Sequence, residues 1–424
     1  MTRIERPGSG DFDRSHDMRV RATADVGEEP QAIGADCAAR ADGGEQNETD
    51  VNCRCKFMQS NSLSRSTVRA RCLAAATGLA LAGCASSPLE PFSTDTPPLV
   101  LTSAAQAGVQ DQRGRFREIY CAVLQARSGE LPDLRPCDDA MTRLGTEPAG
   151  SGRPVPLGPS NRRLVAAVVP GIGFDCFAQW LQPPGTAAQH LRKYGYDLQS
   201  IKVDALSSSK NNARQIRDAV MAMDPAPGTP RLVLVGYSKG TPDALQAIVE
   251  YPEIRPRLAA VVSVAGAVGG SALANDAQQY QADLLRHFPG ATCDSGDGGG
   301  VESLRPGVRR AWLAQNPLPS GVPTYSVVTL PQPERISSIL LPSARKLSLI
   351  DGRNDSQVIF YDQVIPGSSL LGYVNADHWA IAVPIARTHE SVASMFVTRN
   401  DYPREAMMEA VLRYVEEDLA ARGK

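Results

Sequence analysis

The chain has 424 residues, with 44 Lys or Arg against 46 Asp or Glu, so its formal net charge is −2. This balance gives no electrostatic basis for binding nucleic acid, because proteins bind nucleic acid through a basic surface of their own. The sequence contains no Walker loop and no dinucleotide fingerprint, and we expect neither a cofactor nor a bound metal.

The first segment, residues 1–57, is polar and charged, and its only aromatic residues are Phe12 and Phe57. It cannot bury a core of its own, because it has too little apolar surface to offset the entropy lost on folding. We expect it to be disordered, or to be an extension upstream of the natural start, for which Met58 is favoured.

Residues 58–84 have the three parts of an export signal. Three arginines precede a short apolar stretch over residues 73–83, and no acidic residue occurs in the segment. The apolar stretch is too short to span a membrane. Its end, Leu81, Ala82, Gly83 and Cys84, resembles the lipobox of bacterial lipoproteins.

This resemblance implies a signal peptide over residues 58–83 and a lipid on Cys84, which becomes the first residue of the mature protein. Such a protein is anchored in the membrane of the bacterial cell envelope. Ala85 provides no acidic retention signal for the inner membrane, so the outer membrane is favoured. Residues 84–103 include a stretch rich in Ser and Pro and are expected to form a flexible tether.

Four cysteines remain in the mature chain besides the lipidated one, an even number that suits disulfides in an oxidising compartment. They are Cys121, Cys137, Cys176 and Cys293. Proximity favours pairing the first two, inside a helical N-terminal extension over residues 104–160, and pairing the last two. Four cysteines allow three pairings, and buried free thiols are the alternative.

From residue 161 onward, apolar runs alternate with helical patterns. The runs predicted to be strands are residues 164–169, 200–206, 231–235, 258–265, 324–330 and 369–374. Helical spacing occurs between several of them, and a last helix is predicted over residues 406–419. This alternation predicts an α/β fold in residues 161–424, with a mostly parallel sheet covered by helices on both faces. Either 324–330 or 346–351 supplies the seventh strand.

One predicted strand runs into Gly236, Tyr237, Ser238, Lys239 and Gly240, and a helical pattern follows. A Gly-x-Ser-x-Gly turn between a buried strand and a helix is typical of a serine nucleophile held at the edge of a sheet. The two glycines lack a Cβ, so strand and helix can approach closely while Ser238 adopts a strained backbone. Ser238 is the predicted nucleophile, and the Lys239 side chain is expected to keep its charged end in water.

Such a serine needs a base, and in this arrangement an acid and then a histidine follow the serine along the chain. Two of the five histidines precede Ser238, and His287 lies inside an insertion. His378 comes just after the apolar run at 369–374 and is the predicted base. His389 is the second candidate.

The acid that orients the base is predicted in the segment after residue 346. Asp355 follows the apolar run at 347–350 and a turn that contains glycine. A carboxylate in this place fixes the imidazole tautomer and stabilises the imidazolium that forms during the reaction. Asp351 and Asp362 are the alternatives.

The reaction also requires backbone N–H groups aimed at the negative charge that develops on the substrate oxygen. The predicted strand at 164–169 runs into a loop with two glycines at residues 170–174. The first N–H donor is expected on Ile172 or Gly173. The second is the N–H of Lys239, the residue after the nucleophile.

An insertion at residues 267–322 is too long for a simple connection, and long loops are more often functional than idle. Predicted helices near 274–288 and 301–315 flank a glycine-rich acidic loop. Asp294 and Asp297 in this loop raise the question of calcium, but calcium requires several oxygen ligands. A solvated turn is therefore favoured there.

These motifs resemble the α/β-hydrolase superfamily of lipases and esterases, from about residue 164 to the C-terminal helix. The resemblance implies hydrolysis of a small-molecule or lipid carboxylic ester through an acyl-enzyme, with Ser238, His378 and Asp355 as a triad. It also implies that the insertion caps the pocket and shapes the acyl site. The loop at 170–173 departs from the pattern, since it lacks the histidine that many lipases and esterases carry there. The alternatives are a thioesterase or amidase on the same triad, and a non-catalytic envelope binding protein.

Overall fold

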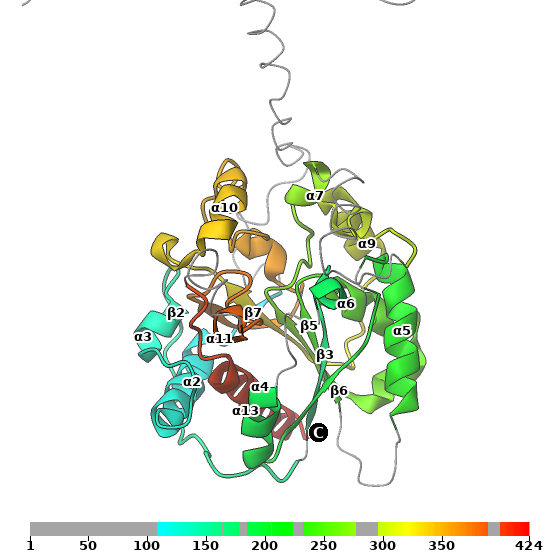
Figure 1. Ribbon diagram of the computed structural model, residues 1–424. Coiled ribbons are helices and arrows are strands. Elements are labelled where there is room, and N and C mark those ends of the chain that lie inside the picture. The colour runs from blue at the N-terminus through cyan, green and yellow to red at the C-terminus, as the bar shows by residue number, and fades with distance from the viewer. Residues whose placement is uncertain are drawn as a thin grey trace, which may run out of the picture. The chain divides into compact units, whose positions relative to one another are not determined.

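The computed structural model describes residues 108–162, 164–177, 185–204, 206–223, 232–276, 296–388 and 399–423 (Figure 1). All of them belong to one compact unit, Leu79–Lys424. The predicted signal peptide, Cys84 and the tether lie outside the described residues. Within the described part of the chain, no helix combines the length and the apolar character needed to cross a membrane.

Among the described residues, eight strands form one sheet in the order β1-β8-β7-β6-β5-β3-β4, and β2 pairs with β8 off this path. All neighbouring strands are parallel except β2, which runs antiparallel to β8. The strands are β1 (Gln110–Asp111), β2 (Met141–Thr142), β3 (Val165–Val169), β4 (Asp197–Ser200), β5 (Leu232–Tyr237), β6 (Leu258–Val264), β7 (Thr324–Thr329) and β8 (Ser369–Val374). The predicted mostly parallel sheet is confirmed.

The choice for the seventh strand is settled by the structure. The run at 324–330 carries β7. Residues 346–351 instead form the end of helix α10 (Leu341–Leu347) and the turn after it. The first of the two candidate segments is therefore the strand.

The strand predicted at 200–206 is wrong. β4 lies earlier, over four residues that are mostly polar, and it forms one end of the sheet, paired with β3. Ile201 and Val203 are buried beyond the strand, in one apolar cluster with residues of α5. The apolar run marks residues that pack on a helix, whereas the edge strand itself carries no apolar signal.

Helices cover both faces of the sheet, as predicted. Val233 and Val235 of β5 pack in the apolar cluster that includes α2 and α13, whereas Leu232 and Leu234 pack in the cluster that includes α5 and α6. This alternation follows from the period of two along a strand. Figure 1 shows α2, α4 and α13 away from α5 and α6. The α-helices of the described residues are α2 (Arg113–Arg127), α3 (Cys137–Ala140), α4 (Gly185–Lys193), α5 (Ser209–Ala222), α6 (Gly240–Glu250), α7 (Leu273–Asp276), α9 (Pro306–Gln315), α10 (Leu341–Leu347), α11 (Ile385–Thr388) and α13 (Arg404–Ala421).

Short 3-10 helices complete the described structure. They are η2 (Phe174–Phe177), η3 (Pro252–Arg257), η4 (Glu302–Leu304), η5 (Pro333–Arg335), η6 (Ser338–Leu340) and η7 (Phe360–Gln363). The helix predicted near 301–315 is divided into η4 and α9, and Pro306 begins the second piece, where the missing N–H of a proline costs least. Where a helix was predicted near 274–288, the structure has the four-residue α7, and residues 277–295 lie outside the described part.

The described part of the N-terminal segment is joined to the sheet. Helix α2 packs against α13 and β8, while β1 and β2 pair with β8. A disulfide joins Cys121 on α2 to Cys137 at the start of α3. Within residues 108–160, the described part of the segment expected as a helical extension, the structure has the helices α2 and α3 and two strands of the sheet.

A buried carboxylate connects three helices on one face of the sheet. The Glu409 side chain on α13 has no exposed surface and accepts hydrogen bonds from Arg127 on α2 and Arg413 on α13. Its Oε2 lies 2.8 Å from Nε2 of His190 on α4. Burial raises the pKa of Glu409, but these hydrogen bonds lower it by more and hold it below its ordinary value of 4.5.

We expect Glu409→Gln to lower the free energy of unfolding at neutral pH by about 3–5 kcal/mol, because Arg127 and Arg413 then lose their buried counter-charge. The folded carboxyl has the lowered pKa, so its contribution is present above the unfolded value of 4.5 and is lost as pH falls through the folded value. Urea unfolding from pH 7 to about pH 3 should therefore show a steeper loss for the wild type than for the variant. Equal slopes, or an equal effect of the exposed Glu334→Gln, would contradict this role.

Candidate active site

The turn between β5 and α6 places Ser238 in a left-handed backbone conformation, with φ at 53°. A Cβ added to Gly236 would lie 2.4 Å from Cα of Thr241, and one added to Gly240 would lie 2.1 Å from the carbonyl oxygen of Val169. Neither position has room for a side chain. Both glycines are therefore required for close approach, as the sequence predicts, and the strain is concentrated on Ser238.

Ser238, His378 and Asp355, predicted as nucleophile, base and acid, form one hydrogen-bonded chain. Oγ of Ser238 lies 2.9 Å from Nε2 of His378, and Nδ1 of His378 lies 2.7 Å from Oδ2 of Asp355. All three residues are buried, and Ser238 is the most exposed of them at 7%. Ser238 and His378 follow β5 and β8, and Asp355 comes from the long connection between β7 and β8. The three meet at the carboxyl edge of the sheet, where parallel α/β proteins place their sites.

Both carboxylate oxygens of Asp355 accept hydrogen bonds from neighbouring residues. Oδ1 accepts hydrogen bonds from the N–H groups of Gln357 and Val358, at 2.9 and 2.7 Å. Oδ2, which faces His378, also accepts a hydrogen bond from the hydroxyl of Thr329. This arrangement fixes the orientation of the carboxylate, and therefore that of the imidazole.

Two residues that support this hydrogen-bonded chain, Thr329 and Tyr237, were not identified as such from the sequence. Thr329 is the last residue of β7, and a polar residue at the end of an apolar run was the available signal. Tyr237 donates a hydrogen bond of 2.7 Å from its hydroxyl to the carbonyl oxygen of His378. Its position beside Ser238 in the motif gives no hint of this contact, which depends on how the last loop folds back.

The alternative acids are engaged elsewhere. Asp351 pairs with Arg353 at 2.7 Å. Asp362 is buried, with Arg310 3.7 Å from its carboxylate, and burial raises the pKa of Asp362 to about 7. His389, the second candidate for the base, and His287, set aside because it lies in the insertion, are both outside the described residues.

The loop after β3 passes close to the serine. A Cβ added to Gly171 would lie 2.9 Å from Cβ of Ser238. Within the described residues, no acceptor is found for the N–H groups of Ile172, Gly173 or Lys239, the three predicted donors. Cys176, at the end of this loop, is disulfide-bonded, and its predicted partner Cys293 lies outside the described residues.

The prediction that the Lys239 side chain is solvated is wrong. The side chain is 1% exposed, and its Nζ lies 2.8 Å from both carboxylate oxygens of Asp243, one turn along α6. Asn212 on α5 donates a further hydrogen bond of 2.8 Å to Asp243. Helix α5 packs over this face of α6, so a charge at Lys239 is enclosed and needs a partner.

The acidic loop of the insertion has its own partners. Asp297 accepts hydrogen bonds from the N–H groups of Ser208 and Gly299, at 2.6 and 2.9 Å. Asp294 lies outside the described residues. In the part of the chain that the structure describes, no three His, Cys, Asp or Glu side chains are grouped as a metal site would require.

Comparison with solved structures finds a carboxyl esterase that resembles most of this chain. The crystal structure of the metagenomic carboxyl esterase MGS0156 matches at a TM-score of 0.71 and 37% sequence identity, over 78% of this chain and 99% of the esterase. The chain belongs to the α/β-hydrolase family. No family profile and no curated protein matches this α/β-hydrolase.

Weaker similarities accompany that match. The mature lipase BlEst2 of Bacillus licheniformis is 19% identical, with a TM-score of 0.43, over 57% of this hydrolase and 93% of the lipase. The lipase of Staphylococcus hyicus is 11% identical, with a TM-score of 0.43, over 63% of this hydrolase and 99% of the lipase.

The buried pair next to the serine yields a stability prediction. Asp243→Asn leaves the Lys239 ammonium enclosed without a counter-charge, and we expect a loss of about 3–5 kcal/mol in the free energy of unfolding. The double variant Lys239→Met with Asp243→Leu removes both charges, so it should be much more stable than the single variant. Urea unfolding measures both.

The exposed pair Arg217 and Asp218 provides the matched control, because surface pairs contribute little. Asp218→Asn should leave the unfolding midpoint nearly unchanged. A double variant no more stable than Asp243→Asn would show that the pair is not the source of the loss.

Proposed function

We propose that this protein is a serine hydrolase that cleaves carboxylic esters through an acyl-enzyme. The observation that carries the proposal is the unbroken hydrogen-bonded chain from Ser238 through His378 to Asp355. The similarity to a carboxyl esterase over nearly its whole length supports an ester as the substrate.

In this mechanism, Oγ of Ser238 attacks the ester carbonyl carbon while Nε2 of His378 takes the hydroxyl proton. The tetrahedral intermediate collapses, and His378 gives the proton to the departing alcohol. Water then attacks the acyl-enzyme with the same base, releasing the carboxylate product and restoring Ser238. Asp355 orients His378 and stabilises the imidazolium that forms on it.

The negative oxygen of the intermediate needs preorganised donors. We assign these to the N–H of Lys239 and to the N–H of Ile172 or Gly173, since the loop after β3 lies beside Ser238. The buried pair of Lys239 with Asp243 holds the first donor, because it fixes the start of α6.

The acyl group is proposed to lie against a small apolar cluster beside the serine. Ala267, whose N–H donates to the carbonyl oxygen of Ser238, packs in this cluster with Val358, Leu304 and the partly buried Ile172. Leu304 belongs to the insertion, which agrees with its expected part in the acyl site. The substrate is accordingly an ester with an apolar acyl chain, and a thioester or amide on the same residues is the second candidate.

Hydrolysis of p-nitrophenyl butyrate tests the assignment. Ser238→Ala and His378→Ala should each lower kcat/KM by about 10⁴-fold or more, because the three residues act as a unit. A fluorophosphonate probe should label the wild type and not Ser238→Ala. A protein that takes up no probe and cleaves no ester would instead be a binding protein on a hydrolase fold.

A second aspartate gives a matched control for the acid. Asp355→Asn should lose about as much activity as the histidine variant, since it destroys the tautomer that His378 requires. Asp351→Asn should retain most activity, because that carboxylate pairs with Arg353. The opposite pattern would assign the acid to Asp351.

We further propose that the protein is lipid-anchored in the bacterial envelope, with the outer membrane favoured. The support is the sequence of residues 58–84, with its basic region, apolar stretch and terminal Cys84. Labelling with a palmitate analogue should mark the wild type and should disappear in Cys84→Ser. Cys72→Ser, a change inside the same signal, is the matched control and should still be labelled; labelling of Cys84→Ser would exclude the anchor.

A further inference from the structure

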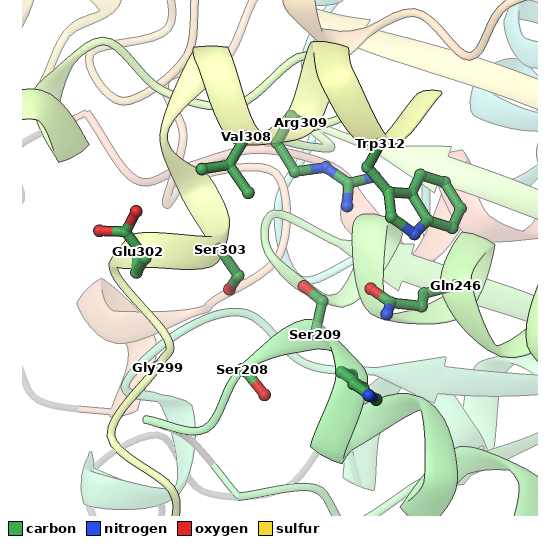
Figure 2. A pocket seen from close by; sticks show the side chains of 10 residues that line it. Ser208, Ser209, Gln246, Gly299, Glu302, Ser303, Val308, Arg309 and Trp312 are labelled. Carbon is green, nitrogen blue, oxygen red and sulfur yellow. The ribbon is translucent and has the colours of Figure 1, made fainter. Parts of the chain in front are cut away.

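A cavity of about 280 Å³ lies between the first turn of α5, helix α6 and the elements η4 and α9 of the insertion (Figure 2). Its lining includes Ser209, Gln246, Arg309 and Trp312. In Figure 2 the polar ends of the first three face the same space. No residue of the hydrogen-bonded chain at Ser238 lines this cavity, so it is separate from the candidate active site.

Arg309 brings a buried cation to the cavity. It is 2% exposed, its Nε donates to the carbonyl oxygen of Val268 at 3.2 Å, and its Cζ lies 4.7 Å from the ring centroid of Trp312. Its Nη2 is buried and has no hydrogen-bond partner among the described residues. Burial lowers the pKa of Arg309 to about 10, against the opposing influence of Asp243. A guanidinium with an unused donor is well suited to binding an oxyanion.

The first turn of α5 adds further donors. The leading N–H groups of a helix have no acceptor within the helix. The Ser208 hydroxyl accepts from the N–H of Asn211, whereas the N–H groups of Ser209 and Lys210 have no acceptor in the described part of the chain. The Ser209 hydroxyl is also buried and, among the same residues, unpartnered. With 14 residues, α5 is long enough for its N-terminus to favour negative charge.

The charged side chains around the cavity are paired with one another, and the unused hydrogen-bond donors remain. Lys239 and Arg309 both interact with Asp243, and Lys239 also interacts with the carboxylate of Asp297. Asp297 accepts hydrogen bonds from the N–H of Ser208, the residue before α5, and from the N–H of Gly299 in its own loop. Glu302 is exposed, pairs with an arginine that does not line the cavity, and points away from Arg309 in Figure 2. Lys239 and Arg309 are thus matched by Asp243 and Asp297, so what the cavity offers an anion is the two unused donors, Nη2 of Arg309 and the hydroxyl of Ser209, which have no partner among the described residues.

We propose that this cavity binds a small organic anion, whose carboxylate or phosphate head accepts hydrogen bonds from Arg309, Ser209 and the first N–H groups of α5. Trp312 and Val308 line the same space and offer apolar surface to a short chain attached to the head. The cavity thus recognises an oxyanion with an apolar tail, at a place apart from Ser238.

Isothermal titration at constant ionic strength tests the proposal with four probes. Butyrate and butyl phosphate carry the two kinds of head on the same chain, inorganic phosphate lacks the chain, and butanol lacks the charge. We expect at least one of the two butyl anions to bind more tightly than inorganic phosphate, and butanol not to bind. Failure of both butyl anions to bind, or equal binding of butanol, would overturn the proposal.

Variants then locate the bound anion. Ser209→Ala removes an unpartnered hydroxyl, so the fold should be kept while the Kd rises at least about tenfold. Arg309→Gln should raise the Kd by about 100-fold, whereas Lys193→Gln, which removes an exposed cation on α4, should change nothing. Ser238→Ala should retain binding. If Ser238→Ala loses binding while Ser209→Ala keeps it, the anion occupies the candidate active site and the proposal is wrong. The comparison of these two variants decides the question even if Arg309→Gln does not fold.

Discussion

The close approach of β3, β5 and α6 at one turn is the constraint on which the candidate site depends. Because Gly236 and Gly240 carry no Cβ, the start of α6 can lie against the end of β3; a Cβ at either position would clash. The same contact turns Ser238 into the left-handed region and places the loop after β3 beside it. Parallel strands end at one edge of the sheet, so residues distant in sequence reach this point without long connections.

Buried charge is the second organising element, and one cluster on each face of the sheet pairs it. Asp243 accepts from Lys239 and Asn212, which joins α6 to α5 on one face. Glu409 joins α2, α4 and α13 on the other face. An enclosed charge tolerates few arrangements, so these clusters specify how the helices sit rather than adding large net stability. The cavity at Arg309 is the exception, since its cation has an unused donor.

Much of the candidate site could be predicted from sequence, because its signals are local. Ser238 stands in a fixed turn motif, and His378 and Asp355 follow apolar runs in the order that the motif requires. The burial of Lys239 was missed, because it depends on α5 packing over α6, which no local pattern reports. β4 was misplaced, because an edge strand needs no apolar residues.

β1 and β2 escaped prediction because strands of two residues have no periodicity, yet they decide what the edge of the sheet presents. β8 is six residues long and hydrogen-bonds to β1 near its start and to β2 near its end. At the opposite side of the sheet stands β4, which is short and mostly polar. An uncovered apolar strand is a template on which a second chain can add its own strand and begin an aggregate. In this fold, β1 and β2 pair with β8 at one edge of the sheet, and the polar strand β4 forms the other edge. Neither edge offers a long apolar strand on which another copy could add a strand.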